Sequence, residues 1–229
     1  MLFRSELSLP SLYFLDRMIL SAKNSDVNEI NSQVLTYFPG QATTFINADS
    51  VTESEFDYVP AEMLHTLEPS GFPQHELTLK IGAPLLLLRN LDPLLGLCNG
   101  TRMVVVNFTS HILECRVLSR NGQRVSDDQS TVFIPRMSLD ASKEDIAIPL
   151  RRRQFPIKPA FAMTINKSQG QSVKWVGLDL RTPVFSHGQL YVALSRCTHP
   201  SRVKVLFEER ERGTKTKNIV YNEVLRGLI

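Results

Sequence analysis

A chain of 229 residues, 42% of them hydrophobic, is long enough to bury a core as one large domain or as two smaller ones. It has no apolar run long enough to span a membrane and no basic segment leading into an apolar stretch at its start, so an intracellular protein without a membrane partner is expected. Its three scattered cysteines include no C-x-x-C pair, so we expect reduced thiols, no disulfide framework and no bound metal.

The distribution of charge is more informative than its sum. A net charge of +3 is too small to indicate a nucleic-acid partner by itself. Residues 77–160, however, hold twelve Lys and Arg against seven Asp and Glu, a net charge of +5, which leaves the remainder slightly acidic. A solvated basic face is the simpler interpretation for most of these residues taken singly.

The first part of the chain has the pattern of an α/β layer. Residues 18–22 are a short apolar run typical of a buried strand. A helix should follow up to Pro39, because Asp26 and Glu29 have the spacing of a capping box and apolar residues then recur on one helical face. Residues 44–46 form a second extended run, and a β-α-β order predicts parallel pairing. Residues 49–76, acidic and then rich in Pro and Gly, are typical of a connection.

From residue 77 the pattern changes to short β-type runs, at residues 84–88, 102–108, 112–118 and 131–134. Asn99-Gly100 and Asn121-Gly122 are turn signals among them. A small antiparallel barrel or meander is the economical interpretation. After Pro149 the α/β pattern returns, with strands predicted at residues 161–165, 173–180 and 203–207 and helices at residues 189–196 and 219–228.

Three segments carry chemical information, and the first is residues 164–172, Thr-Ile-Asn-Lys-Ser-Gln-Gly-Gln-Ser. This polar turn follows an apolar strand directly, and ligands of α/β sheets bind at the carboxyl ends of strands. Backbone N–H groups freed by such a turn can face a phosphate, and Lys167 can neutralise one. On spacing alone, an ordinary strand-to-helix loop is the better interpretation.

The second segment, residues 188–197, is an amphipathic helix that ends in Arg196. An arginine at a helix end is usually a surface charge that offsets the helix dipole. The sharper alternative is an arginine finger, because the planar guanidinium suits the charge that develops on a transferring γ-phosphate. Both alternatives stay open on physical grounds.

The third segment comprises residues 80–90 and 96–102, where Gly and Pro punctuate a buried strand. Arg89 and Arg102 are expected to emerge at its flanks. The simpler interpretation is a β-barrel with surface arginines.

In this order, the three segments resemble the C-terminal half of superfamily 1 DNA helicases of the PIF family, which their Helitron-transposon relatives share. Five segments carry the resemblance within residues 12–225: residues 19–31 (fourth helicase motif), 82–104 (start of the inserted β module), 152–171 (fifth motif), 188–196 (sixth motif) and 216–221 (the family's ending). The resemblance implies an α/β fold, with a RecA-like parallel sheet of the P-loop NTPase type interrupted by a small antiparallel β-barrel-like insertion. It implies a second motor domain at residues 12–60 and 150–229, a 2B-type insertion at residues 61–149, and the tail of a missing N-terminal motor domain at residues 1–11.

The resemblance also implies roles for single residues. Such helicases clamp ATP between two RecA-like domains, so Arg196 would be the arginine finger, with Gln169 and Gly170 also facing the nucleotide. The residues expected to contact single-stranded DNA are Thr164, Asn166, Lys167, Ser168, Arg89 and Arg102. Asn166 replaces a histidine of many relatives, which keeps hydrogen bonding and removes a titratable charge. In these enzymes the inserted module lies beside the DNA, which would explain its +5 charge through phosphate neutralisation.

The chain departs from the family pattern in one large respect. No segment matches Gly-x-x-x-x-Gly-Lys-Ser/Thr, and no acidic pair follows a strand as in a magnesium-binding motif. ATP and Mg²⁺ are therefore expected only if an N-terminal motor half completes the site, and neither is expected on this chain alone.

The leading hypothesis is the C-terminal portion of an ATP-dependent 5′-3′ DNA helicase that is inactive by itself, with polarity inferred from family likeness. Repair, recombination, telomere maintenance or Helitron transposition would be its setting, in the nucleus or a mitochondrion. One alternative is a non-catalytic module that binds single-stranded DNA. Another is an interaction protein that pairs in trans with a separate N-terminal helicase domain, as opposed to one joined in cis.

Overall fold

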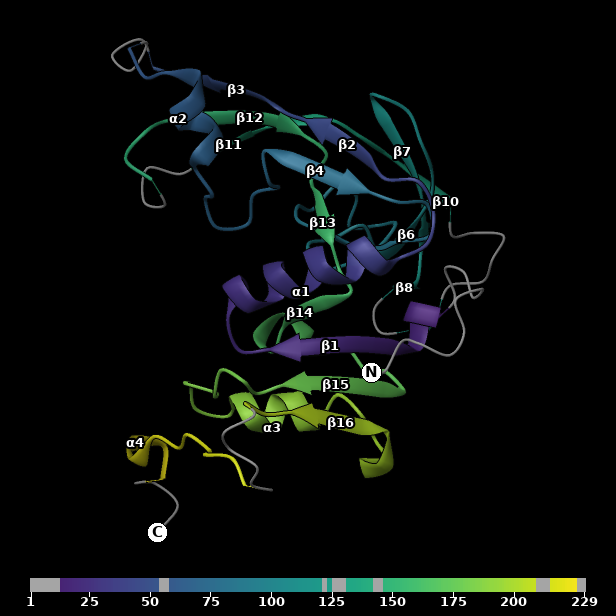
Figure 1. Ribbon diagram of the computed structural model, residues 1–229, viewed down its shortest axis with the longest axis vertical. Helices are drawn as coiled ribbons and strands as arrows, with labels where there is room; N and C mark the ends of the chain where they lie inside the picture. Colours follow the sequence, from purple (N-terminus) through teal and green to yellow (C-terminus); the bar gives the residue numbers. More distant parts are fainter. Residues whose placement is uncertain are drawn as a thin grey trace. The chain divides into compact units, whose positions relative to one another are not determined.

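The computed structural model describes residues 13–53, 58–120, 123–124, 131–141, 146–208 and 215–225. It divides into two compact units, one formed by Met1–Tyr37 with Ala160–Ile229 and the other by Phe38–Pro159. We call them the α/β unit and the β unit (Figure 1). The segment expected at residues 1–11 and the turn signal at Asn121-Gly122 lie outside the described residues.

The α/β unit contains a parallel sheet of four strands in the order β14-β1-β15-β16. The strands are β1 (Arg17–Ser21), β14 (Ala162–Thr164), β15 (Trp175–Asp179) and β16 (Val203–Leu206). Helix α1 (Asn24–Tyr37) packs on this sheet and buries Val27 and Ile30 with Ala162. The Asn31 amide donates to the Ala162 carbonyl at 3.1 Å and accepts from its N–H at 2.8 Å, so it satisfies both backbone groups of one residue and fixes α1 to β14.

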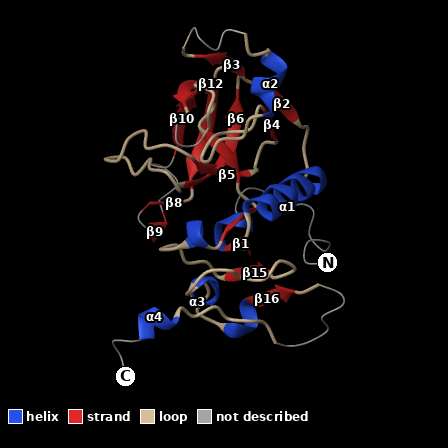
Figure 2. Cartoon of the chain, turned by 90° about the vertical axis from the view of Figure 1, so that its left-hand side faces the viewer, coloured by secondary structure: helices blue, strands red, loops and turns tan. Residues whose placement is uncertain are grey.

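Short helical segments complete the α/β unit, where the helices are concentrated, whereas strands dominate the β unit (Figure 2). They are the 3₁₀ turns η1 (Tyr13–Asp16), η4 (Asn166–Ser168) and η5 (Pro200–Arg202) and the helices α3 (Gln189–Leu194) and α4 (Asn222–Leu225). Among the described residues, no helix is both long and apolar enough to cross a membrane.

The core of the β unit is an antiparallel sheet in the order β10-β7-β6-β5-β13. Its strands are β5 (Pro84–Leu87), β6 (Arg102–Phe108), β7 (Ile112–Val117), β10 (Thr131–Pro135) and β13 (Ile157–Pro159). Smaller antiparallel groups are β2 (Thr43–Ile46) with β4 (Glu76–Leu79), β3 (Ala48–Val51) and β11 (Met137–Asp140) on either side of β12 (Leu150–Gln154), and β8 (Ser119–Arg120) with β9 (Gln123–Arg124). One buried cluster, which includes Phe45, Leu77 and Phe155, joins the β2–β4 pair to the large sheet.

The α/β class is confirmed, but two sequence-based expectations about its details are wrong. Residues 43–46 do not form a parallel strand: β2 pairs antiparallel with β4, and Phe45 packs in the core of the β unit. The parallel partners of β1 are β14 and β15, which follow the insertion in the chain. Asp26 is not a helix cap either, because α1 begins at Asn24 and the Asp26 carboxylate accepts from the hydroxyls of Ser21 and Ser25.

The region expected to be a connection, residues 49–76, has structure of its own. It contains most of β3, helix α2 (Ala61–Thr66) and the start of β4. Because β3 pairs with β12 and β2 with β4, these strands belong to the β unit. This unit therefore runs from residue 38 to residue 159, compared with the predicted bounds of residues 61 and 149.

Candidate functional site

A tight polar turn follows β14 at the carboxyl edge of the parallel sheet. The N–H of Ile165 donates to the Ser21 carbonyl at 3.0 Å, which ties the turn to the end of β1. Ser168 Oγ donates to the Ile165 carbonyl at 2.6 Å, and the N–H of Gln171 donates to the Ser168 carbonyl at 3.0 Å. Gly170 has a φ of +80°, a left-handed conformation that favours glycine. Local hydrogen bonds and this one residue therefore set the path of the turn.

Arg196 lies directly against this turn. Its Nη1 donates to the carbonyl oxygens of Ser168 at 3.3 Å and Gln171 at 3.0 Å. Its Nε donates to the Val192 carbonyl at 2.9 Å and its Nη2 to Ser195 Oγ at 2.8 Å. The segments that resemble the fifth and sixth helicase motifs therefore contact each other directly. Their roles in nucleotide binding stay predictions.

The expected ligand contacts in the turn differ in accessibility. Asn166, Lys167, Gln169 and Gly170 are exposed, whereas Thr164 and Ser168 are buried. The hydroxyl of Ser168 is already engaged by the turn, so Ser168 shapes the backbone and is not presented to a strand. Neighbouring atoms partly desolvate the ammonium group of Lys167 and lower its pKa, although its side chain remains accessible.

The two arginines expected at the flanks of a barrel strand belong to the β unit, and they have different surroundings. Arg102 is only 4% exposed, because its place opposite Leu86 puts it within the large sheet. The expectation that it emerges at the surface is wrong. Arg89 is partly exposed, and its guanidinium carbon lies 5.1 Å from the ring centroid of Phe72. Of this pair, Arg89 is the residue that a DNA strand can reach.

Sequence reasoning missed three polar groups of the α/β unit. Asp179 ends β15 and is 4% exposed, and Arg181 donates to its carboxylate through Nε at 3.0 Å and Nη2 at 2.8 Å. Burial opposes ionisation of Asp26, but hydrogen bonds led by that from Thr182 hold its pKa below the usual range. Gln189 is buried, and its Nε2 has no hydrogen-bond partner among the described residues. The sequence did hold a signal for two of them: Asp179 is a polar residue at the end of an apolar strand, and Gln189 is a polar residue in an otherwise apolar helix.

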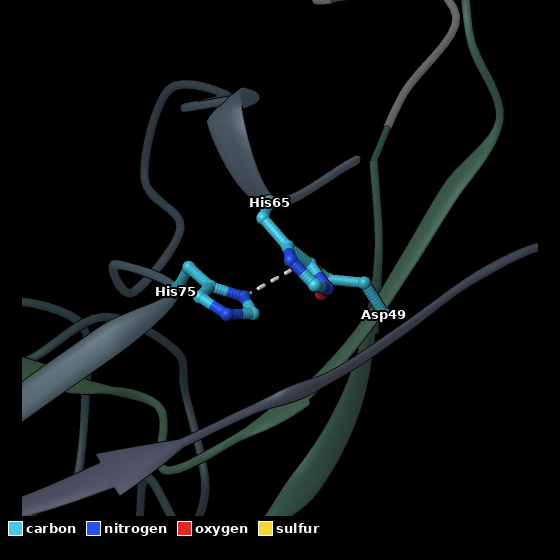
Figure 3. A group of neighbouring side chains, drawn as sticks. All are labelled: Asp49, His65 and His75. Atoms are coloured by element: carbon cyan, nitrogen blue, oxygen red, sulfur yellow. Dashed lines mark hydrogen bonds and ion pairs between the residues drawn. The ribbon is translucent and has the colours of Figure 1, made fainter. Parts of the chain in front are cut away.

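A group of metal-ligating side chains lies in the β unit, formed by Asp49, His65 and His75 (Figure 3). Their nearest ligand atoms lie within 4.8 Å of one another, and imidazole and carboxylate groups suit several transition metals. The arrangement is nevertheless that of an ion-pair cluster. The rings of the two histidines stack with centroids 3.8 Å apart, so they do not converge in their planes on a common point.

Arg152 occupies both oxygens of the Asp49 carboxylate. Its Nε and Nη2 each donate at 2.8 Å, and both side chains are fully buried. Arg152 also donates to the carbonyls of Pro73 and Leu64, while His75 Nδ1 lies 3.4 Å from the Asp49 carboxylate. The cluster thus joins β3, β12 and the end of α2, and it serves the structure of the β unit.

Solved helicase structures share this fold. The crystal structure of Pif1 helicase from Candida albicans superposes with a TM-score of 0.67 at 24% identity, over 98% of this chain and 51% of that one. The Bacteroides Pif1 helicase in complex with ADP-AlF3 and ssDNA superposes with a TM-score of 0.66 at 22% identity, over 98% of this chain and 46% of that one. The parallel sheet interrupted by an antiparallel unit is therefore the fold of a helicase of this class.

Sequence comparison identifies the family within that class. Residues 62–108 match the family model for the 2B domain of DNA helicase Pif1. The ATP-dependent DNA helicase PIF1 of Homo sapiens is 33% identical over 190 residues, which are 82% of this chain and 26% of that protein. The Pif1 helicase of Campylobacter jejuni is 29% identical over 193 residues, 83% of this chain and 42% of that protein. The chain belongs to the PIF family of helicases, and it spans less than half the length of these relatives.

Proposed function

We propose that this chain is the second motor portion of an ATP-dependent 5′-3′ DNA helicase. The observation that carries the proposal is the contact between Arg196 and the turn at residues 166–171. In α/β proteins ligands bind at the carboxyl ends of strands, and the turn that Arg196 contacts starts at the carboxyl end of β14. The relatives named ATP-dependent DNA helicases are more than twice as long as the segment that matches this chain. In the proposed enzyme, an N-terminal motor half would supply the loop that binds the ATP phosphates, either in the same chain or as a separate protein.

The geometry supports a specific role for Arg196. Its Nε, Nη1 and Nη2 all donate hydrogen bonds within the protein. The four acceptors named above, three carbonyls and one hydroxyl, are uncharged oxygens. A γ-phosphate offered by the N-terminal half would form shorter, charge-assisted hydrogen bonds with the same guanidinium. Arg196 would then exchange part of its contact with the turn for contact with the nucleotide. Gln169 and Gly170, exposed in that turn, would move with this exchange.

The same turn supports binding of single-stranded DNA. Asn166 and Lys167 are exposed beside the carbonyls that hold Arg196, so a strand that contacts them would be linked to the nucleotide through a single turn. A lysine contributes to such binding by neutralising a phosphate and releasing counterions. In the β unit, Arg89 offers a second accessible guanidinium, and we leave buried Arg102 out of the DNA surface.

An assay of complementation tests the motor role. The chain is mixed with, or fused to, the N-terminal motor half of a PIF-family helicase, and ATP hydrolysis is measured with Mg²⁺ and single-stranded DNA. Hydrolysis should require both halves, and Arg196→Ala should lower kcat by about 10³-fold. Arg153→Ala, at an exposed position of β12, is the matched control and should leave kcat unchanged. Full activity of the Arg196→Ala variant would contradict the arginine-finger role.

The alternative function is a non-catalytic module that binds single-stranded DNA, favoured by the absence of a Gly-x-x-x-x-Gly-Lys-Ser/Thr segment from this sequence. It predicts the same salt-sensitive DNA binding as the motor role. The two differ in the complementation assay, because a module without motor function gains no ATPase activity from an N-terminal half.

A further inference from the structure

The amino ends of the parallel strands carry a row of one aromatic and two cationic side chains. Arg17, the first residue of β1, is the register partner of Trp175, the first residue of β15. Val176 pairs with Val203, the first residue of β16, so Arg202, which directly precedes that strand, lies beside Trp175. The three residues therefore lie next to one another at the amino ends of three adjacent strands, β1, β15 and β16, whose arrows point the same way in Figure 1.

The row and the turn use different side chains, although the chain segment after the turn leads back to the row. The turn follows β14 at the carboxyl ends of the strands, and Ser21, the last residue of β1, is the register partner of Thr164. Arg17 and Trp175 begin the same strands. Because β14 and β15 are both parallel to β1, the chain crosses back along the sheet between Thr164 and Trp175, and Val173, two residues before Trp175, donates its N–H to the Arg196 carbonyl at 3.0 Å. The row therefore lies near the backbone of Arg196, and its side chains are distinct from those of the turn.

The two guanidinium groups both lie over the indole ring at long range. The guanidinium carbons of Arg17 and Arg202 each lie 5.8 Å from the ring centroid of Trp175, near the outer limit of a cation–π contact. Trp175 remains 37% exposed. Arg17 is held in place, since its Nη1 donates to the Tyr13 carbonyl at 3.1 Å and its guanidinium lies 3.9 Å from the Tyr13 ring. The row thus combines a partly exposed ring with two cations, of which Arg17 is held in place.

A further cation extends the row along β16. Lys204 pairs in register with Gly177, two residues after Trp175, so it lies on the same face of the sheet as the row. Lys204 and Arg202 are exposed and form no ion pair with the described residues of the chain. Lys174, beside the ring in sequence, is neutralised by Asp16 at 3.1 Å. The charge that remains on this face is positive.

A partly exposed aromatic ring with cations close to it matches the chemistry of a single nucleic-acid strand. A base stacks on the ring while the neighbouring phosphates contact the cations, and neither interaction needs a particular base. An acidic peptide would use the cations only, and an apolar partner would leave them desolvated. We propose that Arg17, Trp175, Arg202 and Lys204 form a second contact for single-stranded DNA at the amino edge of the sheet. The choice of DNA as the nucleic acid rests on the proposed function.

The sequence provides a built-in reporter for this contact, because Trp175 is the only tryptophan of the chain. The full chain is titrated with oligothymidylate at low salt while tryptophan emission is recorded, and the anisotropy of a labelled oligothymidylate is followed in parallel. Stacking on Trp175 should quench its emission in a saturable way that added salt reverses. Polyglutamate, which carries charge but no bases, should leave the emission unchanged.

Variants separate the row from the rest of the molecule. Replacing Arg202 and Lys204 together by Gln should raise the midpoint of quenching by about ten-fold, since two phosphate contacts are lost. The matched control removes the same charge outside both the row and the basic segment, through Lys215→Gln and Lys217→Gln, both at exposed positions. Trp175→Leu should weaken binding measured by anisotropy, and Trp175→Phe should retain most of it, because phenylalanine keeps a stacking face.

The outcomes distinguish this contact from the proposed function. Binding by anisotropy with unchanged tryptophan emission would overturn the second contact and leave DNA binding by the helicase portion intact. No binding by either measurement would overturn both. Equal quenching by polyglutamate would assign the row to acidic partners and overturn its role in holding a strand. The quenching of Trp175 emission is measured on the unmodified chain, so this test does not depend on the folding of any variant.

Discussion

Arg196 donates a hydrogen bond of 3.0 Å to the carbonyl oxygen of Gln171, which lies 25 residues earlier in the chain. The contact joins the end of α3 to the turn after β14, and the N–H of Val173 reinforces it by donating to the Arg196 carbonyl at 3.0 Å. A residue proposed to sense the nucleotide therefore also holds the turn proposed to contact DNA. Structural and catalytic effects of changing Arg196 must be measured separately.

Arg196→Ala should lower the free energy of unfolding of the chain by about 1–3 kcal/mol, because the carbonyls of Ser168, Gln171 and Val192 lose a charged donor in a partly buried place. Urea denaturation followed by circular dichroism measures this. Arg153→Ala, at an exposed position, should change the value by less than about 0.5 kcal/mol. Equal stabilities for the wild type and the Arg196→Ala variant would show that these bonds do not hold the turn.

Gly170→Ala should destabilise the chain by about 1–2 kcal/mol for a reason that concerns the backbone alone. A Cβ at this position would meet nothing within 4 Å, but the φ of +80° is unfavourable for any residue with a side chain. Gly177→Ala provides the comparison, because its Cβ would make an ordinary contact of 3.6 Å with Ile19 and no positive φ is involved. Thermal unfolding of both variants measures the two losses of stability. Equal losses for Gly170→Ala and Gly177→Ala would contradict the role of the positive φ.

Asp49→Asn should be far more costly than Asp140→Asn, although each change removes the carboxylate partner of an arginine. The Asp49–Arg152 pair is fully buried, so the change leaves a buried cation without its counter-charge, at a cost of about 3–5 kcal/mol. The Arg151–Asp140 side chains are 49% and 56% exposed, and such pairs contribute about 0–1 kcal/mol. Chemical denaturation of the two variants measures the difference. Similar losses would mean that burial does not set the strength of these pairs.

The same pairs show why sequence reasoning found one part of the β unit and missed another. Residues 102–108 and 112–118 have runs of β-branched and apolar residues, and they form β6 and β7 as predicted. Strand β12 has three consecutive arginines, of which the middle one is buried. Its counter-charge, Asp49, lies 103 residues earlier, and no local pattern contains that information. In the site, likewise, the proximity of Arg196 to the turn came from the family resemblance, and spacing alone left it open.

Raising the pH should weaken the contribution of Lys167 to DNA binding before it affects other lysines. Desolvation lowers the pKa of Lys167 below its ordinary value of 10.5, so this ammonium group loses its proton, and its attraction for phosphate, at a lower pH than an ordinary lysine does. The sign is therefore a fall in affinity as pH rises through the lowered pKa. Lys167→Arg should remove this part of the pH dependence, since arginine stays charged. Anisotropy titrations of both proteins at constant salt across alkaline pH give the comparison; identical profiles would contradict the assignment.

Cys115 should be unreactive in the folded chain and should make its stability sensitive to alkaline pH. Burial, followed by the nearby Glu114 carboxylate, raises the pKa of its thiol from 9.0 to about 12. A raised folded-state pKa stabilises the folded chain fully below pH 9.0, and this contribution is lost as the pH rises towards about 12, by about 1.4 kcal/mol for each pH unit. The difference in unfolding free energy between the wild type and a Cys115→Val variant should follow this slope, because the other alkaline titrations are common to both proteins. Thiol labelling provides an independent check, since partly exposed Cys98 should react in the folded chain and Cys115 only after unfolding.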